Sequence, residues 1–314
     1  MMEFYVFVKR IKAELEELCG KDYTVETREV FDNNGTVDKG MSIRRAGTKE
    51  FPVVSLNMYY EHYLEGLTAH EIAKDIWDMF NSFESSEVEE SILMDFDKVK
   101  DKVIFKLISY ERNQKLLENM PYVMYCDLAI IFNVLLERDE KGQMTVPIHN
   151  YHIKLWGITE EELYQLAKKN TPKLYHAELT PMDELMEQLK RDEGENSADD
   201  FYERTVDFNA EISPLPLYIL SNTSLLNGAT VILYDGLLRN IAEEMESDLI
   251  LLPSSIHEII ILPDIEGLDI KVMEENVRWI NKREVAVKDV LSDNIYKYNK
   301  EKDNVYLISI GIQS

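Results

Sequence analysis

The stretch LILLPSSIHEIIILPD, residues 249–264, holds two apolar runs joined by a short polar connection. Proline at 253 ends the first run, because it cannot donate a hydrogen bond to a central ladder. The following serines favour a turn, since their hydroxyls bond the nearby backbone. The stretch predicts antiparallel strands at Leu249–Leu252 and Glu258–Leu262, connected by Pro253–Ile256. The three consecutive isoleucines predict that the second strand is an interior one, buried on both faces.

The same connection carries a serine, a histidine and a glutamate, the residue types of a hydrolase triad. On a strand, Ser255 and His257 share one face and Glu258 points to the other, so this glutamate cannot orient the histidine. The chain also has no G-x-S-x-G elbow. The pattern favours a structural connection. It leaves Ser254, Ser255 and His257 as candidate residues of a polar or hydrolytic site.

Two other segments, at about residues 21–85 and 121–170, predict strand–strand–helix units. Each has two alternating strand candidates, a short helix and a longer helix that opens on GLTAHEI (66–72) or GITEEEL (157–163). Both openings contain a T-x-x-E capping box, which marks the start of a helix. The sequence therefore predicts helices at 66–83 and 157–170, with Thr68 and Thr159 as N-caps. We interpret the two units as a degenerate structural repeat.

Strand and helix candidates are mixed along the rest of the chain. Phe96, Val99, Val103 and Leu107 recur at helical spacing and predict one or two helices before the second unit. GATVILY (228–234) is read as a strand, and helices are expected in the segments that start at Asp235 and Asp269. Many connections are hairpin-sized. The expected fold class is α+β, with mixed, mainly antiparallel sheets and packed helices.

An acidic stretch, RDEGENSADD (191–200), has five acidic residues and no apolar residue larger than alanine. Such a composition cannot bury enough apolar surface to order itself. Residues 191–204 are therefore predicted to form an exposed linker or loop between an α+β region at 1–190 and a second one at 205–314.

The charge balance bounds the partners. The chain of 314 residues carries a formal net charge of −25, which repels phosphate backbones and predicts no nucleic-acid partner. The N-terminus lacks the basic and small-residue features of a signal peptide, and the apolar runs are too short to span a membrane. The two cysteines, Cys19 and Cys126, form no disulfide framework, so a reducing cytoplasm is expected.

Metal and cofactor signals are sparse. His149 and His152 form an H-x-x-H pair that could place two imidazoles on one helical face, but no spacing identifies further ligands. The phosphate loop and the dinucleotide-binding glycine motif do not occur. No metal and no cofactor are expected, and the two histidines remain the candidates for a metal site.

The segment NMYYEHYLEG (57–66) brings three tyrosines together. Tyr59 and Tyr63 share one helical face, and Tyr60 faces elsewhere. Exposed tyrosines suit protein recognition, because the ring is apolar and the hydroxyl is polar. The alternative is that these rings cover the hairpin that precedes them.

Several long segments carry a resemblance: CDLAIIFNVLLE, HIKLWGITEEELYQLAKKNTP, LILLPSSIHEIIILP and LSDNIYKY. Over nearly its whole length the chain resembles a family of uncharacterised bacterial proteins, mainly from Gram-positive anaerobes, known only as a domain of unknown function. The central and C-terminal segments are also similar to a second uncharacterised bacterial family. The resemblance implies a cytoplasmic bacterial protein on an α+β scaffold. It brings no activity and no catalytic residues.

Two functions remain open. The missing catalytic signatures, the acidic charge and the repeat-like units favour a non-enzymatic protein-interaction or binding module. The alternative is a hydrolase with a site around Ser254, Ser255 and His257. An enzyme should bring this connection into a concave pocket with polar groups from the central region. The sequence does not define the substrate, the partner or the oligomeric state.

Overall fold

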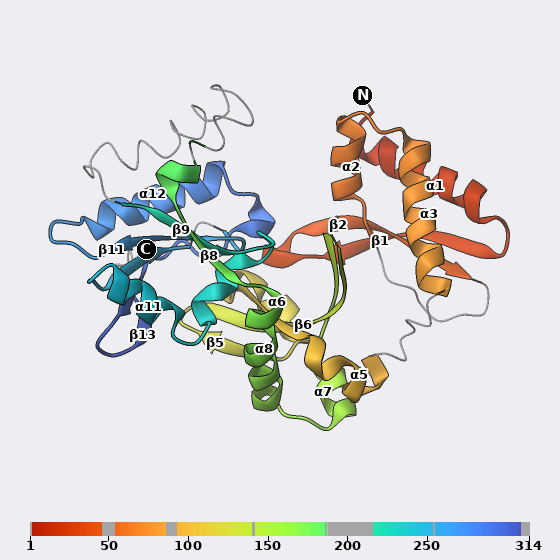
Figure 1. Cartoon of the computed structure of the whole chain (residues 1–314). Helices are drawn as coiled ribbons and strands as arrows, with labels where there is room; N and C mark the ends of the chain where they lie inside the picture. Colours follow the sequence, from red (N-terminus) through yellow and green to blue (C-terminus); the bar gives the residue numbers. More distant parts are fainter. Residues whose placement is uncertain are drawn as a thin grey trace. The chain divides into compact units, whose positions relative to one another are not determined.

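The computed structural model describes residues 2–45, 54–85, 93–139, 142–185, 187, 216–253 and 255–308. The chain divides into two compact units, Met1–Lys98 and Val99–Ser314 (Figure 1). Both contain antiparallel strands with helices packed on them, so the fold class is α+β, as the sequence predicts. The acidic stretch at 191–204 lies outside the described residues, and its expected role as an exposed linker stays a prediction.

The first unit is built on a long hairpin. β1 (Tyr23–Phe31) pairs antiparallel with β2 (Val37–Arg45), and the short β3 (Val54–Ser55) lies beside β2. Asn34 and Gly35 both have positive φ in the turn between β1 and β2. Asparagine and glycine tolerate this conformation best, which is why the DNNG motif marks the turn.

Three helices accompany this hairpin: α1 (Phe4–Cys19), α2 (Asn57–Leu64) and α3 (Ala69–Ser85). The apolar stripes of α1 and α3 turn inward, because burying them removes apolar surface from water. The resulting core contains Phe7, Ile11, Leu15, Met41, Ile43, Ile72 and Ile76.

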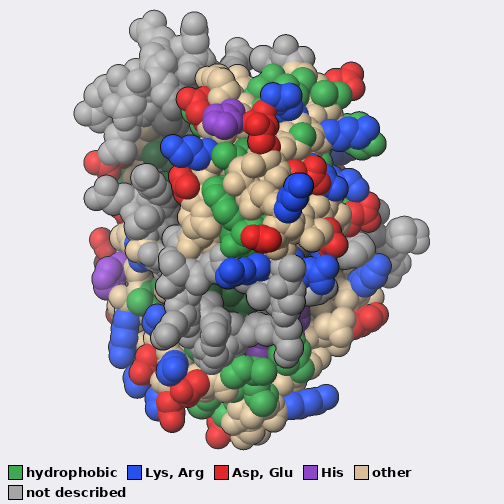
Figure 2. Space-filling model, turned by 90° about the vertical axis from the view of Figure 1, so that its right-hand side faces the viewer, with side chains coloured by type: hydrophobic (Ala, Val, Ile, Leu, Met, Phe, Trp, Pro, Cys, Tyr) green, Lys and Arg blue, Asp and Glu red, His purple; other side chains and the backbone are tan. Residues whose placement is uncertain are grey.

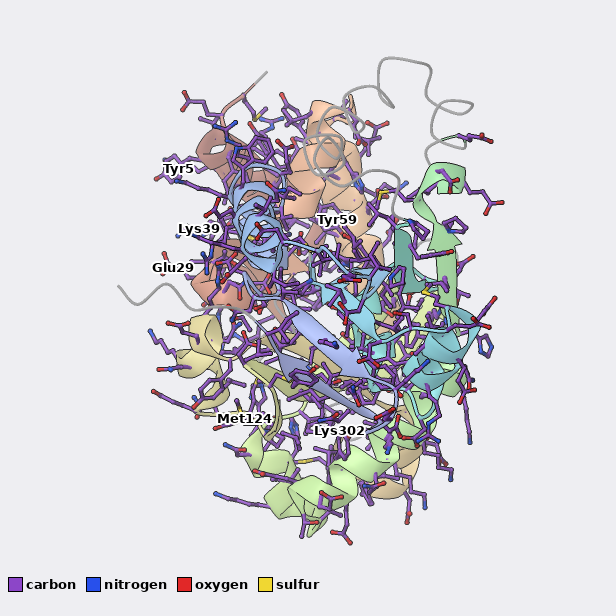
Figure 3. The ribbon with its side chains drawn as sticks, turned by 90° about the vertical axis from the view of Figure 1, so that its left-hand side faces the viewer. Tyr5, Glu29, Lys39, Tyr59, Met124 and Lys302 are labelled. Carbon is purple, nitrogen blue, oxygen red and sulfur yellow. The ribbon has the colours of Figure 1, made fainter. Side chains whose placement is uncertain are left out.

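The surface of the protein mixes both signs of charge. On the face shown in Figure 2, Lys and Arg side chains lie scattered among Asp and Glu side chains. Glu29 of β1 and Lys39 of β2 are partners in the strand register and form an ion pair of 2.6 Å (Figure 3). Exposed pairs of this kind contribute little stability, because water screens them.

The second unit begins with a four-stranded sheet. β6 (Leu128–Asp139) lies between β4 (Val103–Ser109) and β5 (Tyr122–Tyr125), and β7 (Gly142–Pro147) also pairs with β6. The helix predicted over Phe96–Leu107 is therefore wrong for the residues from Val103 onward. Six of the seven residues of β4 are buried, so both faces are apolar. A strand buried on both faces also places apolar residues four apart, which imitates a helical pattern.

The two predicted capping boxes form, one in each unit. Glu71 N–H donates to Thr68 Oγ1 over 3.2 Å at the start of α3. Glu162 N–H donates to Thr159 Oγ1 over 3.1 Å at the start of α8 (Glu160–Leu174). Each long helix follows a strand pair and a short helix, which in the second unit is α7 (Asn150–Trp156). This order of elements confirms that part of the repeat prediction. The superposition of the two strand–strand–helix units stays a prediction.

The second sheet of this unit has the order β13-β12-β10-β11-β9-β8. Its strands are β8 (Ala177–Pro181), β9 (Tyr218–Asn222), β10 (Leu249–Leu252), β11 (Ile259–Pro263), β12 (Tyr296–Asn299) and β13 (Asn304–Leu307). β8 pairs with β9, so elements on both sides of residues 191–204 belong to one sheet.

The hairpin predicted from LILLPSSIHEIIILPD forms in register, with Leu249 opposite Pro263 and Leu252 opposite Ile260. β12 and β9 flank the pair, so both of its strands are interior. All four residues of β10 are buried. α12 (Ile270–Arg283) covers one face of the hairpin through Met273 and Val277 (Figure 1).

GATVILY was expected to be a strand and is instead the 3-10 helix η4 (Gly228–Leu233), followed by α11 (Leu237–Glu244). The cause is a close approach at Gly228. A Cβ at this position would overlap Ser221 Oγ and the carbonyl oxygen of His257. Only glycine fits there, so the segment packs tightly against β9 and the β10–β11 connection instead of adding a strand.

Candidate functional site

The β10–β11 connection uses its polar groups locally. Ser255 is buried, and its hydroxyl donates to Glu258 Oε1 over 2.8 Å and accepts the His257 N–H over 3.0 Å. The serine and the glutamate therefore meet within the connection. Ser254 lies outside the described residues. The hydroxyl of Ser255 closes the turn, which is the usual use of serine at such a position.

The His257 ring lies between two partners from elsewhere in the second unit. Its Nδ1 accepts the Asn227 N–H over 3.3 Å, so the proton belongs on Nε2, which lies 3.5 Å from Asp289 Oδ1. The hydrogen bond from His257 lowers the pKa of Asp289. Both ring nitrogens are thus engaged. Sequence reasoning missed Asp289 because the pairing is tertiary.

His149 and His152 cap a helix. The His149 N–H donates to His152 Nδ1 over 2.9 Å at the start of α7, and the rings of His149, His152 and Trp156 stack. Burial, with a smaller contribution from His149, lowers the pKa of His152 to about 4. Within the described ranges, no group of three or more His, Cys, Asp or Glu side chains could hold a metal.

The tyrosines of α2 pack on α1. The Tyr60 hydroxyl donates to the Met2 carbonyl over 2.9 Å, and the rings of Tyr60 and Tyr63 contact Phe7. These side chains are partly buried against the core of the first unit. They contact α1 and the core that it shares with the hairpin, so they provide structure in this unit.

A polar cleft lies beside α12, and it is called here the α12 cleft. Its volume is about 390 Å³, which falls within the range of small-ligand sites. Its lining residues are Arg112, Arg278, Asn281, Lys282, Val287, Val290 and Asp293.

Separate segments build the α12 cleft. Asn281 and Lys282 follow Arg278 on α12 by three and four positions, which places both beside Arg278 on one helical face. Arg112 comes from the 3-10 turn after β4, and Asp293 comes from the segment that leads into β12.

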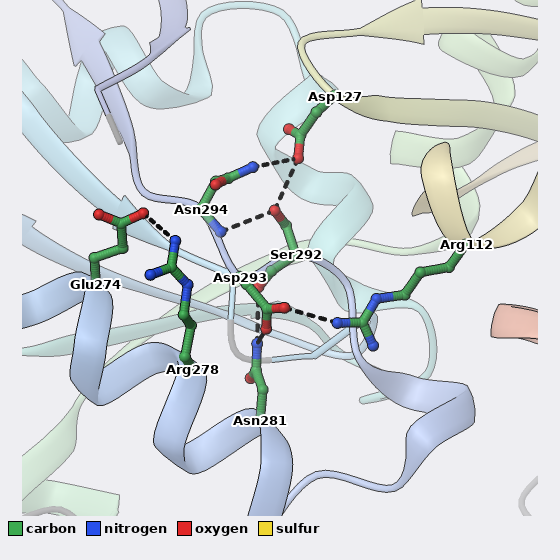
Figure 4. A network of polar contacts seen from close by, with 8 residues as sticks. All are labelled: Arg112, Asp127, Glu274, Arg278, Asn281, Ser292, Asp293 and Asn294. Atoms are coloured by element: carbon green, nitrogen blue, oxygen red, sulfur yellow. Dashed lines mark hydrogen bonds and ion pairs between the residues drawn. The ribbon is translucent and has the colours of Figure 1, made fainter. Parts of the chain in front are cut away.

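A hydrogen-bond network fixes Asp293 in the cleft (Figure 4). Asn281 Nδ2 donates to the Ser292 carbonyl over 2.8 Å and to Asp293 Oδ1 over 2.9 Å. Arg112 Nη2 donates to Asp293 Oδ2 over 2.7 Å. Because both contacts of Asn281 Nδ2 are acceptors, the orientation of this amide is set. Its Oδ1 is buried and has no donor among the described residues.

Asp127 holds the same segment from the other side. Its carboxylate accepts Ser292 Oγ and Asn294 Nδ2 over 2.9 Å each, and the Tyr296 hydroxyl over 2.5 Å. Burial, with a smaller contribution from Asp127, raises the pKa of Tyr296 well above its usual range. Asp127 thus ties the turn between β5 and β6 to the segment that carries Asp293.

The cations of the α12 cleft outnumber the carboxylates that contact them. Glu274 is buried and pairs with Arg278 Nη2, and Asp293 pairs with Arg112 Nη2. Lys282 is exposed and has no hydrogen-bond or ion-pair partner in the described part of the chain. One positive charge is therefore left over in a protein whose net charge is −25.

The lining residues that the structure describes include no histidine, cysteine, serine or threonine. Their chemistry suits holding an anion, because guanidinium and ammonium groups are donors only. The local signal in the sequence was the segment 278–288, which holds four basic residues and one acidic residue in an acidic chain. That signal was not recognised at the sequence level.

A second cavity is much smaller. It lies between the first sheet of this unit and η4, and its lining includes Asn133, Thr171, Asn227 and Thr230. Its volume of about 20 Å³ suits a single water molecule and no larger ligand. The α12 cleft is therefore the better candidate for a functional site.

The fold and the cleft define an α+β protein with a preformed polar site. The chain belongs to the family of unknown function DUF5688, whose profile matches residues 4–300. This match confirms the resemblance to a domain of unknown function. No curated protein and no solved structure matches the chain. No helix in the described ranges is long and apolar enough to cross a membrane.

Proposed function

We propose that this protein is a non-enzymatic binding module that holds an anionic group of its partner in the α12 cleft. The observation that carries the proposal is the excess cation. Three cations line the cleft, and among the described residues only Arg112 and Arg278 have carboxylate partners. A ligand anion would complete the pairing of Lys282.

The two guanidinium groups support this function because they are held in place and still have donors to spare. Among the described residues, Arg112 and Arg278 are each bonded through Nη2 alone. A guanidinium has five N–H donors, so most of them remain available. The anchors Asp293 and Glu274 restrict both side chains before a ligand arrives, which reduces the entropic cost of binding.

The charge of the whole chain favours a discrete anionic group over a polyanion. A net charge of −25 repels a nucleic-acid backbone at long range, and a single cleft cannot offset that repulsion. An anionic group carried by a protein or a small molecule needs only the local pairing. We further propose that the protein acts in a bacterial cytoplasm, on the basis of the family resemblance and the two unpaired cysteines.

A comparative capture experiment tests the proposal. The double variant Arg112→Gln/Lys282→Gln and the wild-type protein are used as baits, and mass spectrometry identifies what each retains. Arg283→Gln is the matched control, since Arg283 lies on α12 but does not line the cleft. We expect at least one ligand to be retained by the wild type and the control and lost from the double variant. Identical retention by all three baits would contradict the proposal.

A further inference from the structure

We infer that the anionic group in the α12 cleft is a single carboxylate attached to a short aliphatic group. This inference rests on the proposed function and specifies its ligand class. The carboxylate could end a partner chain or belong to a free aliphatic acid. The chemistry is the same in both cases.

The first reason is geometric. Both arginines of the cleft already pair with carboxylates, Arg112 with Asp293 and Arg278 with Glu274. A guanidinium presents its N–H groups in a flat fork that matches a planar carboxylate. The N–H groups of these guanidinium groups that are not yet bonded can donate to a further carboxylate.

The second reason is the charge balance. Three cations and two carboxylates leave one positive charge, and one carboxylate supplies one negative charge. A phosphate monoester carries about −1.5 to −2 near pH 7 and would leave negative charge uncompensated. The surrounding net charge of −25 penalises that remainder.

The third reason is the apolar part of the lining. Val287 and Val290 are the apolar members of an otherwise polar lining. The Val287 side chain is exposed, and that of Val290 is buried. Exposed apolar surface next to the cations suits a ligand whose carboxylate is bonded to an aliphatic group. A volume of about 390 Å³ has room for a small acid or for the last residues of a chain.

Titrations followed by NMR of the ¹⁵N-labelled full chain test the inference. The probes are isobutyrate, the tripeptide N-acetyl-Ala-Ala-Val with a free carboxylate, the same tripeptide as its C-terminal amide, and inorganic phosphate. We expect both carboxylates to bind in the millimolar range or tighter, and the amide to bind about tenfold more weakly than the free acid. Lys282→Gln should weaken the binding of the free acid about tenfold, and Arg283→Gln should leave the affinity for the free acid unchanged.

The probes separate the two ligand sources. A tripeptide that binds about tenfold more tightly than isobutyrate indicates a chain terminus, and equal affinities indicate a small acid. Lys282 is exposed and unpaired among the described residues, so its replacement does not endanger the fold. Phosphate binding that is tighter than carboxylate binding and is lost in Lys282→Gln would overturn the inference and leave the proposed function intact. If Lys282→Gln changes the affinity of no probe and the capture experiment shows no difference between the baits, the inference and the proposed function both fail.

Discussion

The β10–β11 connection and the α12 cleft are both rich in polar side chains, yet they use them differently. In the connection, Ser255 bonds Glu258 and the neighbouring backbone, and both nitrogens of the His257 ring have partners. In the cleft, the guanidinium groups of Arg112 and Arg278 keep unused donors, and Lys282 has no partner among the described residues.

The difference teaches how a triad-like motif can mislead. Ser255 and Glu258 satisfy hydrogen bonds within the tight turn, whereas the His257 ring joins the turn to Asn227 and Asp289. The unused donors of the cations in the α12 cleft satisfy no hydrogen bond of a turn. Glu274 is buried, and its pairing with Arg278 offsets part of the cost of removing this carboxylate from water.

The largest expected effect concerns Asp127, which holds the segment that carries Asp293 through hydrogen bonds. Asp127→Ala removes three hydrogen bonds and leaves the buried Tyr296 hydroxyl without its acceptor. We expect the free energy of unfolding to fall by about 3–4 kcal/mol, measured by urea denaturation. The control is Asp303→Gly at an exposed position with positive φ, which removes the acceptor of the Tyr298 hydroxyl on the same strand and should cost less. Equal losses would show that Asp127 does not tie the two sheets together.

A comparable effect is expected at His152 as the pH changes. Burial lowers the pKa of His152 to about 4, whereas the unfolded histidine titrates near 6.5. The unfolded state therefore binds the proton first, and the stability falls as the pH drops from about 6.5 to about 4. The full loss is on the order of 3 kcal/mol. His152→Gln should flatten this part of the stability profile, and the exposed His176→Gln should not. An unchanged profile in His152→Gln would contradict the lowered pKa of His152.

A smaller effect separates the structural and the hydrolytic reading of the connection. Ser255→Ala removes two hydrogen bonds of a buried hydroxyl, and should lower the free energy of unfolding by about 2 kcal/mol. The variant is measured by urea denaturation and by ester hydrolysis with p-nitrophenyl acetate. A hydrolytic activity of the wild type that disappears in Ser255→Ala without loss of stability would support the hydrolase alternative.

Much of the fold was predictable where local chemistry determines it. The turn at Asn34 and Gly35, the Thr68 and Thr159 caps and the hairpin at 249–263 follow from residues that are close in the sequence. β4 and η4 were missed because burial on both faces and the close approach at Gly228 depend on the rest of the fold.

The candidate site was less predictable for the same reason. The α12 cleft joins Arg112 to residues 278–293, and the position of Asp293 depends on Asp127. A single sequence does not show that these segments meet. The partner of His257, Asp289, likewise comes from a distant segment, so only the residues of the connection itself could be named in advance.

The central claim is that Lys282 of the cleft serves binding and not stability. The most direct test is urea denaturation of the wild type, Lys282→Gln and Arg283→Gln, with and without N-acetyl-Ala-Ala-Val at ten times its dissociation constant for the wild type. We expect the three proteins to unfold alike without the peptide, within about 0.5 kcal/mol. The peptide should stabilise the wild type and Arg283→Gln by about 1.4 kcal/mol, and Lys282→Gln by clearly less. Equal stabilisation of all three proteins, or a large loss of stability in Lys282→Gln alone, would contradict the claim.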